Sequence, residues 1–415
     1  MPVDLIAHQA HANPTSPSSP ISNWLSVVSH LDPRYGGLSA VVPHLASLLT
    51  TSDRFHVQLD AFCLPHEHSK PEGYPALPVT FWPASRKSWL LDRSLSRIFR
   101  RSAAQSDGVH IHGLWEQSTR VAARTARALG KPYIVSAHGM LQSSALADKR
   151  ARKQLYAALF ERRNLEGAAC LHALTRAEAR NYRDFGCKRP IATIPYGVDV
   201  PAVLSPALFL QTFPFARNKR LILFLGKVHE EKGVDRLIRA WAKVGHGWPD
   251  SCLVLAGPSY PAMRARLEKL ASDLGVSHRI LFTGNLLYPE KWSALAAAEC
   301  FVLPSHSEGL SVSVLEAMGA GVPVIVTENC NLPEVVEGNA GWQTSPRVED
   351  IAAALELCLS NSPEANQHLG QNGTALIRER YTWSGVAAQM GQLYTWVQGG
   401  SKGDSVPEGL AIEMC

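Results

Sequence analysis

Two glutamates, Glu308 and Glu316, flank the start of a helical pattern within residues 301–318. The apolar run 301–304 precedes them, so the segment reads as strand, tight loop and helix. Ligands of open parallel sheets bind at such strand ends. Gly309 lets the backbone approach a ligand closely, and the first helical amides point outward with the positive end of the helix dipole. Those amides belong to Leu310, Ser311 and Val312. The segment therefore suits a diphosphate.

The two carboxylates suit the sugars on either side of such a diphosphate. Glu308 precedes the helix, where it can accept hydrogen bonds from sugar hydroxyls, and Glu316 lies about two turns inward, where it can take both hydroxyls of a ribose. Considered singly, Glu308 could be a helix cap and Glu316 an exposed helical residue. Both residues belong to one strand, loop and helix segment that contains Gly309, and Glu316 has apolar neighbours. These features favour a pair of carboxylates that binds the two ends of one nucleotide sugar.

Two lysines follow the first strand of the same half of the chain. Lys227 directly follows Gly226, and Lys232 lies five residues further on, so the two flank the start of a helix whose apolar residues fall on one face. Ammonium groups at a strand-to-helix turn can hold phosphate oxygens and neutralise a departing diphosphate. Two exposed surface lysines are the alternative reading.

The first half of the chain offers glycines and histidines at comparable positions. Gly36 and Gly37 follow the first expected strand and open an apolar helix, where backbone amides could approach phosphate. His138 lies at the carboxyl end of another strand. His110 and His112 alternate along a strand and so point to the same side, which makes a metal pair conceivable. We expect no metal, because no carboxylate or cysteine completes the set nearby.

Alternating short apolar runs and longer helical patterns indicate parallel strands joined by crossover helices. Expected strands in the first half are 24–29, 56–62, 79–82, 109–112, 133–138, 170–174 and 191–195. A second series covers 221–226, 252–256, 280–283, 300–304 and 323–327. The fold class is therefore α/β, with two doubly wound Rossmann-like domains.

Length and composition agree with two globular domains. The chain has 415 residues, of which 46% are hydrophobic and 19% charged, and it carries a net charge of +5. That mild excess suits anionic ligands without demanding nucleic acid. The eight cysteines are too widely spaced for zinc or redox motifs and indicate reduced core thiols. No apolar run is long enough to span a bilayer, so we expect a cytoplasmic protein.

These motifs resemble the retaining glycosyltransferases of GT-B architecture, of the family-four type, whose mark is two glutamates separated by seven residues. The resemblance covers 29–394 and implies two facing domains, donor binding by the second and acceptor binding mainly by the first. It implies that Lys227 and Lys232 are the family's basic pair. Lys227 departs from the usual arginine and cannot make a bidentate phosphate contact.

The resemblance also implies roles for residues that spacing alone leaves open. Gly37 faces the donor diphosphate, His138 reaches the transferred sugar, and Leu286 lies where the donor base binds. Residues at the acceptor cleft are His110, His112 and Trp115. The implied reaction moves a hexose-type sugar, with retention and without a metal or other cofactor, from a UDP- or GDP-linked donor to a glycan or lipid-linked hydroxyl, in polysaccharide or glycoconjugate synthesis. An epimerase, a phosphorylase or a non-catalytic binder on this fold are the alternatives; a dehydrogenase is disfavoured because its glycine motif is absent.

Basic stretches at 86–101 and 149–166 raise the question of membrane contact. The second carries six cations around the apolar residues Leu155, Leu159 and Leu165, a pattern that suits an anionic bilayer surface at the inner face of the membrane, although a solvated basic face is the alternative. The expected domain organisation is a flexible tail (1–22), an acceptor-side domain (23–200), a donor-binding domain (201–380), a helix returning to the first domain (381–398) and a second flexible tail (399–415).

Overall fold

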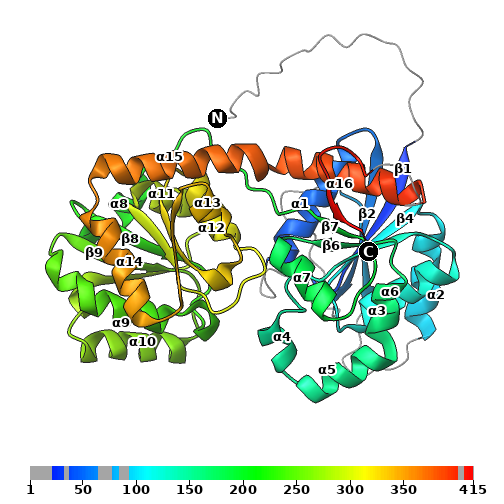
Figure 1. Ribbon diagram of the computed structural model, residues 1–415, viewed down its shortest axis with the longest axis horizontal. Coiled ribbons are helices and arrows are strands. Elements are labelled where there is room, and N and C mark those ends of the chain that lie inside the picture. The colour runs from blue at the N-terminus through cyan, green and yellow to red at the C-terminus, as the bar shows by residue number, and fades with distance from the viewer. Residues whose placement is uncertain (1–20, 32–36, 64–76, 84–92, 401–405, 415) are drawn as a thin grey trace, which may run out of the picture.

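The computed structural model describes residues 21–31, 37–63, 77–83, 93–400 and 406–414. These residues form two α/β domains, each built on one sheet, as Figure 1 shows. Structural neighbours given below share this GT-B arrangement, so the predicted fold class is confirmed. The expected domain boundaries stay predictions.

The N-terminal domain contains an eight-stranded sheet in the order β14-β7-β6-β5-β4-β1-β2-β3. All neighbouring strands are parallel except β14, which runs antiparallel to β7. The strands are β1 (Ser22–Val28), β2 (Phe55–Cys63), β3 (Val79–Pro83), β4 (Gly108–His112), β5 (Tyr133–Ser136), β6 (Cys170–Ala173), β7 (Ile191–Thr193) and β14 (Ala411–Glu413). Central strands such as β4 and β5 are buried along their whole length, which explains their continuous apolar runs.

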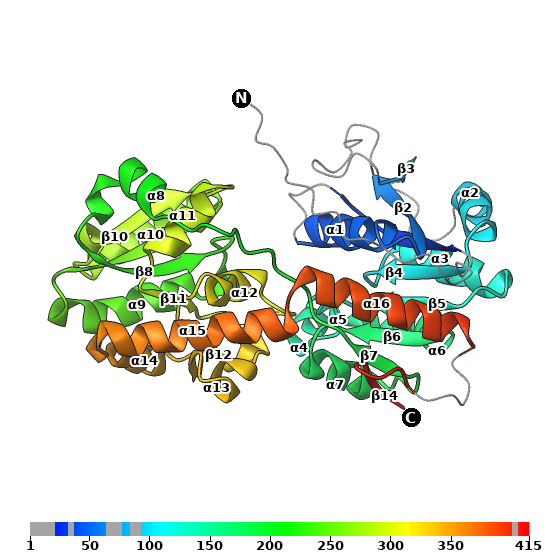
Figure 2. The ribbon, with the colours of Figure 1, turned by 90° about the horizontal axis from the view of Figure 1, so that it is seen from above.

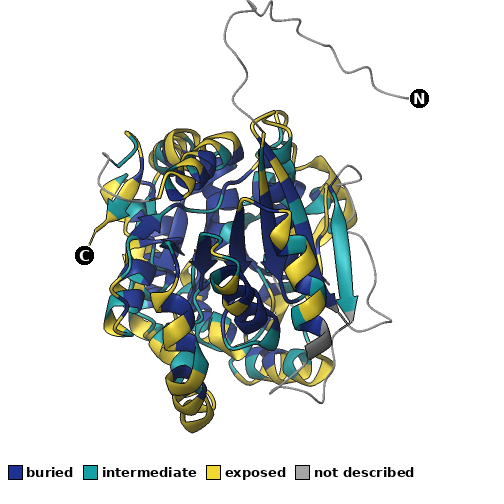
Figure 3. Cartoon of the chain, turned by 90° about the vertical axis from the view of Figure 1, so that its right-hand side faces the viewer, coloured by how far each residue is buried: buried dark blue, intermediate teal, exposed yellow. Residues whose placement is uncertain are grey.

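Helices cover both faces of this sheet. Figure 3 shows the buried strands in dark blue between helices whose outer faces are exposed. The helices are α1 (Leu38–Thr50), α2 (Arg93–Ala104), α3 (Gln117–Ala128), α4 (Ser143–Ala147), α5 (Arg150–Tyr156), α6 (Arg162–Glu166) and α7 (Arg176–Asp184). A π-helical turn, Ala157–Glu161, joins α5 to α6, so the expected helix 149–166 is present but irregular.

The C-terminal domain contains a six-stranded parallel sheet in the order β10-β9-β8-β11-β12-β13. Its strands are β8 (Arg220–Leu225), β9 (Ser251–Ala256), β10 (Ile280–Gly284), β11 (Cys300–Leu303), β12 (Val324–Thr327) and β13 (Gly341–Thr344). Its helices are α8 (Ala207–Thr212), α9 (Val234–Val244), α10 (Pro261–Asp273), α11 (Glu290–Ala297), α12 (Val312–Gly319), α13 (Glu334–Glu337), α14 (Val348–Ser360) and α15 (Pro363–Arg380).

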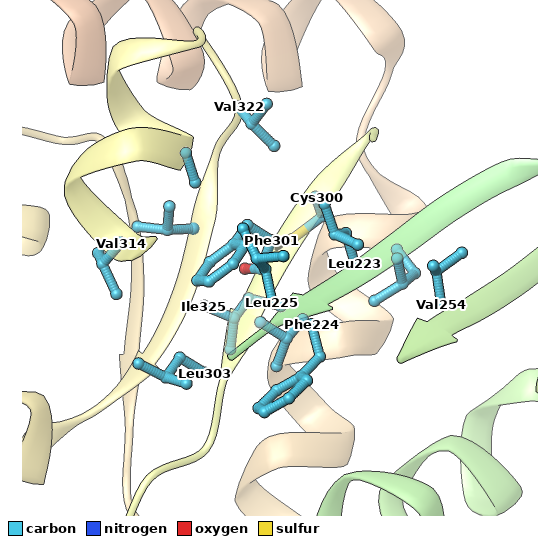
Figure 4. Packing of buried hydrophobic residues seen from close by; sticks show 14 of the residues in the cluster. Leu223, Phe224, Leu225, Val254, Cys300, Phe301, Leu303, Val314, Val322 and Ile325 are labelled. Atoms are coloured by element: carbon cyan, nitrogen blue, oxygen red, sulfur yellow. Dashed lines mark hydrogen bonds between the residues drawn. The ribbon is translucent and has the colours of Figure 1, made fainter. Parts of the chain in front are cut away.

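The core of the C-terminal domain forms between this sheet and its helices. Figure 4 shows Phe301 of β11 beside Leu223 and Leu225 of β8, with Val314 of α12 on one side. All four side chains are at most 6% exposed. Burial of large apolar side chains at about 25 cal/mol per Å² is the main stabilising contribution to such a sheet. The strands that carry the predicted site are therefore held firmly.

The last long helix, α16 (Trp383–Gln398), crosses back onto the N-terminal domain, continuing the line of α15 along both domains (Figures 1 and 2). Its Tyr394 ring stacks on the indole of Trp24 with centroids 3.7 Å apart. Where α15 ends, the amide of Val198 donates to the carbonyl of Tyr381 at 2.8 Å, so the two chain crossings lie side by side.

The structure differs from the sequence-based expectations at two places. Residues 411–413, expected within a flexible tail, form β14, which pairs with the otherwise open edge of β7. The apolar stripe expected in 149–166 is also divided, because Leu165 is buried whereas Leu155 and Leu159 are 58% and 55% exposed. The π-helical turn rotates the later residues relative to the earlier ones, which breaks a stripe calculated for a regular helix.

Candidate active site

Glu308 lies on the loop between β11 and α12, at the carboxyl end of the C-terminal sheet. β11 pairs with both β8 and β12, at the centre of that sheet. Glu308 is 9% exposed, and its Oε1 lies 2.5 Å from the ammonium nitrogen of Lys232. A backbone hydrogen bond also holds this loop in place, since the amide of Glu308 donates to the Asn329 carbonyl at 3.1 Å. A nearly buried carboxylate paired in this way is held in one position.

Lys232 comes from the neighbouring strand-to-helix turn. It ends a short 3-10 turn (Glu230–Lys232), and Gly233 then takes a positive φ of 67° before α9 begins. A Cβ at Gly233 would lie 2.2 Å from the carbonyl oxygen of Pro304, so only glycine allows the two loops to approach. Lys227 is exposed and lies over the ring of Tyr260 at 5.4 Å.

Glu316 also has a cationic partner. It is 9% exposed within α12, and its Oε1 lies 2.6 Å from the ammonium nitrogen of Lys291 on α11. Burial raises the pKa of the Glu316 carboxyl, and the charge of Lys291 opposes that effect. Each expected carboxylate thus forms an ion pair with one lysine, and its free lone pairs can accept hydrogen bonds from hydroxyl groups.

The remaining donor-side residues surround the start of α12 and the end of β8. Ser311 is the residue before α12, so the amides of Ser311 and Val312 lie in its first turn. Gly226 continues the β8 ladder by donating to the Ala256 carbonyl at 3.0 Å. Residues placed around this end of the sheet are Gly309, which is half-buried, and Leu310 and Leu286, which are buried.

The glycine pair of the first half is only partly described. Gly37 is exposed and directly precedes α1, and a Cβ placed on it would meet no described residue within 4 Å. Gly36 lies outside the described residues. That Gly37 faces the donor diphosphate stays a prediction.

His138 follows β5 in an unusual conformation, with a positive φ of 52°. Its Nε2 lies 3.0 Å from Nδ1 of His112, and its Nδ1 lies 2.6 Å from the hydroxyl of Tyr196. Burial, followed by the neighbouring His112 and His172, lowers the pKa of His138 well below the usual histidine value. The ring is therefore neutral at pH 7, and a non-glycine residue in left-handed backbone is a feature found at functional sites.

The loop that carries His138 touches the loop that carries Glu308. A Cβ on Gly139 would lie 3.3 Å from the Cα of Gly309. The side-chain amide of Gln142 donates to the Glu308 carbonyl, and the hydroxyls of Ser144 and Ser307 are 2.8 Å apart. The expected acid and histidine loops, about 170 residues apart in the chain, thus meet between the two domains.

The expected role of His110 at the acceptor cleft is wrong. Its ring is fully buried, Nδ1 lies 2.9 Å from the Tyr394 hydroxyl, and Nε2 lies 2.7 Å from Ser136 Oγ. No ring nitrogen is left for a substrate. His112 is buried as well, and its Nε2 lies 3.0 Å from Ser26 Oγ, so it reaches the cleft only through His138. Alternation along β4 predicted one shared side for the two histidines but not that α16 covers His110.

Trp115 lies where β4 leads into α3. Its indole nitrogen donates to the Met140 carbonyl at 3.1 Å, and its amide donates to a carboxylate oxygen of Glu161 at 3.1 Å. The indole is half-buried beside the His138 loop.

Sequence reasoning missed four residues that support this site: Lys291, Gln142, Tyr196 and Glu178. Glu178 accepts hydrogen bonds from the amides of Gly139 and Leu174, both at 2.7 Å, and so fixes the His138 loop from behind. Tyr196 lies between Pro195 and Gly197, which interrupt the strand pattern and were the signal that could have found it. Lys291 carried no local signal, because its partner lies 25 residues away in the sequence.

Comparison with known proteins agrees with this geometry. The Glycosyl transferases group 1 family matches residues 209–376, and the Glycosyl transferase 4-like domain matches 36–197. A relative from Corynebacterium glutamicum, the GDP-mannose-dependent monoacylated alpha-(1-6)-phosphatidylinositol monomannoside mannosyltransferase, is 30% identical over 219 residues, covering 48% of this chain and 54% of that protein. The chain spans about half the length of the curated relatives it matches.

Solved structures resemble nearly the whole chain. Sucrose-phosphate synthase from Thermosynechococcus elongatus superposes with a TM-score of 0.74 at 21% identity, covering 91% of this chain and 100% of that one. HepE from Anabaena, solved with UDP and glucose, gives a TM-score of 0.73 at 18% identity, covering 90% of this chain and 99% of that one. With two adjoining family matches and this shared two-domain fold, the chain belongs to the group 1 glycosyltransferases of GT-B architecture.

Proposed function

We propose that the protein transfers a hexose-type sugar, with retention of configuration, from a nucleotide diphosphate sugar to a glycan or lipid-linked hydroxyl. The observation that carries this proposal is the meeting of the Glu308 loop with the His138 loop between the domains. A donor held by α12 would present its anomeric carbon to the N-terminal domain at this point. Solved neighbours bound to UDP, and a relative that uses GDP-mannose, support a UDP- or GDP-linked donor.

Each side chain then has a definite task. Glu316 holds the ribose hydroxyls, and Glu308 orients the transferred sugar. Lys232, together with Lys227 and the start of α12, stabilises the negative charge of the departing diphosphate. His138 stays neutral and hydrogen-bonds a sugar hydroxyl, for which its ring must exchange one of its present partners, His112 or Tyr196.

In the retaining reaction proposed here, the leaving diphosphate oxygen takes the proton of the attacking acceptor hydroxyl on the same face of the sugar. The glycosidic carbon–oxygen bond to the donor breaks as the bond to the acceptor forms. The two lysines supply the charge stabilisation, so the proposed reaction is independent of a metal. A product of the same anomeric configuration, analysed by proton NMR, tests this step.

Calorimetric titration with UDP and GDP tests the donor site. We expect Glu316→Ala to weaken nucleotide binding by roughly ten- to a hundredfold, since one lost hydrogen bond to a charged group is worth about 1.5–3 kcal/mol. Glu337→Ala, on an exposed glutamate of α13, is the matched control. Undiminished affinity in Glu316→Ala would remove its ribose role. Nucleotide binding without transfer of sugar to any acceptor would instead indicate an epimerase or a non-catalytic binder.

We also propose peripheral contact with an anionic membrane through the helix α5 to α6, as at a cytoplasmic leaflet. No helix in the described part of the chain is both long and apolar enough to cross a bilayer. Leu155 and Leu159 are more than half exposed on a helix that also presents exposed arginines, a combination that suits anionic headgroups. Leu159→Asp should reduce co-sedimentation with phosphatidylglycerol vesicles; equal sedimentation with phosphatidylcholine vesicles would contradict the proposal.

A further inference from the structure

A cavity of about 530 Å³ lies in the N-terminal domain between α4, α5 and the start of α3. We call it the α5 cavity. The described residues that line it include the cations Arg150, Lys153 and Arg162 and the aromatic residues Trp115 and Phe185, and none of them is acidic. Figures 1 and 2 show α4 and α5 at the side of the N-terminal domain that faces the C-terminal domain.

The three cations differ in how firmly they are held. Lys153 donates to the Ala145 carbonyl at 2.5 Å and so ties α5 to α4. Arg162 donates to the Phe185 carbonyl at 3.1 Å, with its guanidinium 4.9 Å from the Phe185 ring. Arg150 is exposed and makes no hydrogen bond or ion pair within the described residues. The cavity therefore combines two positioned cations with one that is unpaired, and no carboxylate in its lining balances them.

Aromatic rings form another wall of the cavity. The rings of Trp115 and Phe185 meet edge to face, with centroids 5.9 Å apart. The Lys153 ammonium lies 6.0 Å from the indole centroid. An aromatic face beside a cationic cluster suits a ligand that has both a sugar ring and an anionic group, because sugar faces pack on indole while guanidinium and ammonium hold phosphate.

The cavity is close to the proposed reaction centre. Ser143, which lines the cavity, lies five residues after His138 in the chain. The Cα atoms of His138 and Ser143 are therefore at most about 18 Å apart. Two backbone turns bring them closer still, because the amide of Met140 donates to the Ala137 carbonyl and the amide of Gln142 donates to the Gly139 carbonyl, both at 3.1 Å. One molecule could therefore occupy the α5 cavity and still present a hydroxyl beside His138.

We propose that the α5 cavity binds the phosphate or diphosphate group of a phosphorylated glycosyl acceptor. The inference rests on the proposed glycosyl transfer and adds the chemical class of the acceptor. Arg150, Lys153 and Arg162 would hold the phosphate oxygens, and Trp115 would pack on the adjoining sugar. A soluble sugar phosphate and a lipid phosphate present the same oxygens to these cations, and the binding experiment distinguishes the two sources.

Direct binding in the presence of saturating UDP or GDP tests this assignment, because the nucleotide fills the donor site. The probes are glucose 1-phosphate, glucose as its neutral counterpart, and dihexanoyl phosphatidic acid as a monomeric lipid phosphate. Ala147→Glu places a carboxylate in the cavity lining, and Ala151→Glu places the same group on an exposed position of α5 outside it. Arg150→Ala and Arg152→Ala form a second pair on the same helix.

We expect the dissociation constant for at least one phosphate probe to rise roughly tenfold in Ala147→Glu and in Arg150→Ala, and to be unchanged in the two controls. Glucose should bind more weakly than glucose 1-phosphate. The probe that responds identifies the source of the phosphate. Equal effects of both members of each pair, or no preference for phosphate over glucose, would overturn the assignment. Failure of UDP and GDP to bind would contradict the proposed function instead.

Discussion

His172 is a buried histidine behind the proposed site, and its titration should make the stability of the N-terminal domain sensitive to acid. The Nε2 of His172 lies 2.8 Å from the Ile194 carbonyl, which can only accept, so this nitrogen carries the proton. Its Nδ1, 2.6 Å from Ser136 Oγ, must then accept. Both nitrogens are thus committed in the neutral ring, and a second proton at Nδ1 would require the Ser136 hydroxyl to change from donor to acceptor.

The magnitude follows from the pKa of His172. Burial lowers this pKa from 6.5 to about 4, so between these values the unfolded chain binds a proton that the folded chain does not. Folding stability is therefore lost as the pH falls through this window. Between pH 7 and pH 5, His172 alone should destabilise the domain by about 2 kcal/mol. Three further rings, His110, His112 and His138, have lowered pKa values and add to this loss.

Amide hydrogen exchange in β5 and β6 measures this effect, because protected core amides report the free energy of opening their domain. The variant His172→Gln keeps a donor for the Ile194 carbonyl but cannot titrate. We expect its opening free energy to fall about 2 kcal/mol less than that of the wild type between pH 7 and pH 5. His246→Gln, on an exposed histidine, should behave like the wild type. Equal losses in His172→Gln and the wild type would refute the reasoning.

Two further predictions concern a buried acid and a crowded glycine. Burial raises the pKa of Glu161 from 4.5 to about 7, so the folded chain keeps a proton that the unfolded chain releases, and stability falls as the pH rises through this window. Glu161→Gln should therefore gain about 2 kcal/mol relative to the wild type between pH 5 and pH 8, measured by urea denaturation; a constant difference would contradict it. Gly257 has a φ of 142°, and a Cβ there would lie 1.8 Å from the Gly226 carbonyl oxygen. Gly257→Ala should lower the melting temperature and nucleotide affinity, whereas Gly247→Ala, with open space around it, should change neither.

The fold could be predicted because its signals are local. Every expected strand is present, since strands such as β9 and β11, buried along their length, require continuous apolar runs. The missed strands, β13 and β14, are short and carry a mixed pattern, and β14 forms only by pairing with the edge of β7. Short edge strands are stabilised by their partner more than by their own sequence.

The sequence predicts which loops carry the site, but not which side chains pair with one another there. The strand-to-helix segments that carry Glu308 and Lys232 have a recognisable order of residue types, and both lie at the carboxyl end of the sheet. Side-chain partners from other elements, such as Lys291 for Glu316, leave no mark on either segment. The burial of His110 likewise depends on Tyr394, 284 residues later in the chain. Such contacts exist only once the chain has closed on itself.

The return of α16 also bears on the order in which the protein can form during synthesis. Tyr394 stacks on Trp24, and Val386, Met390 and Leu393 belong to the same apolar cluster as β1 and β2. A nascent chain that has released only its first two hundred residues still lacks this covering helix. The face of its sheet that α16 covers therefore stays exposed until α16 has left the ribosome. Of the two described domains, the N-terminal one thus emerges earlier and is completed later.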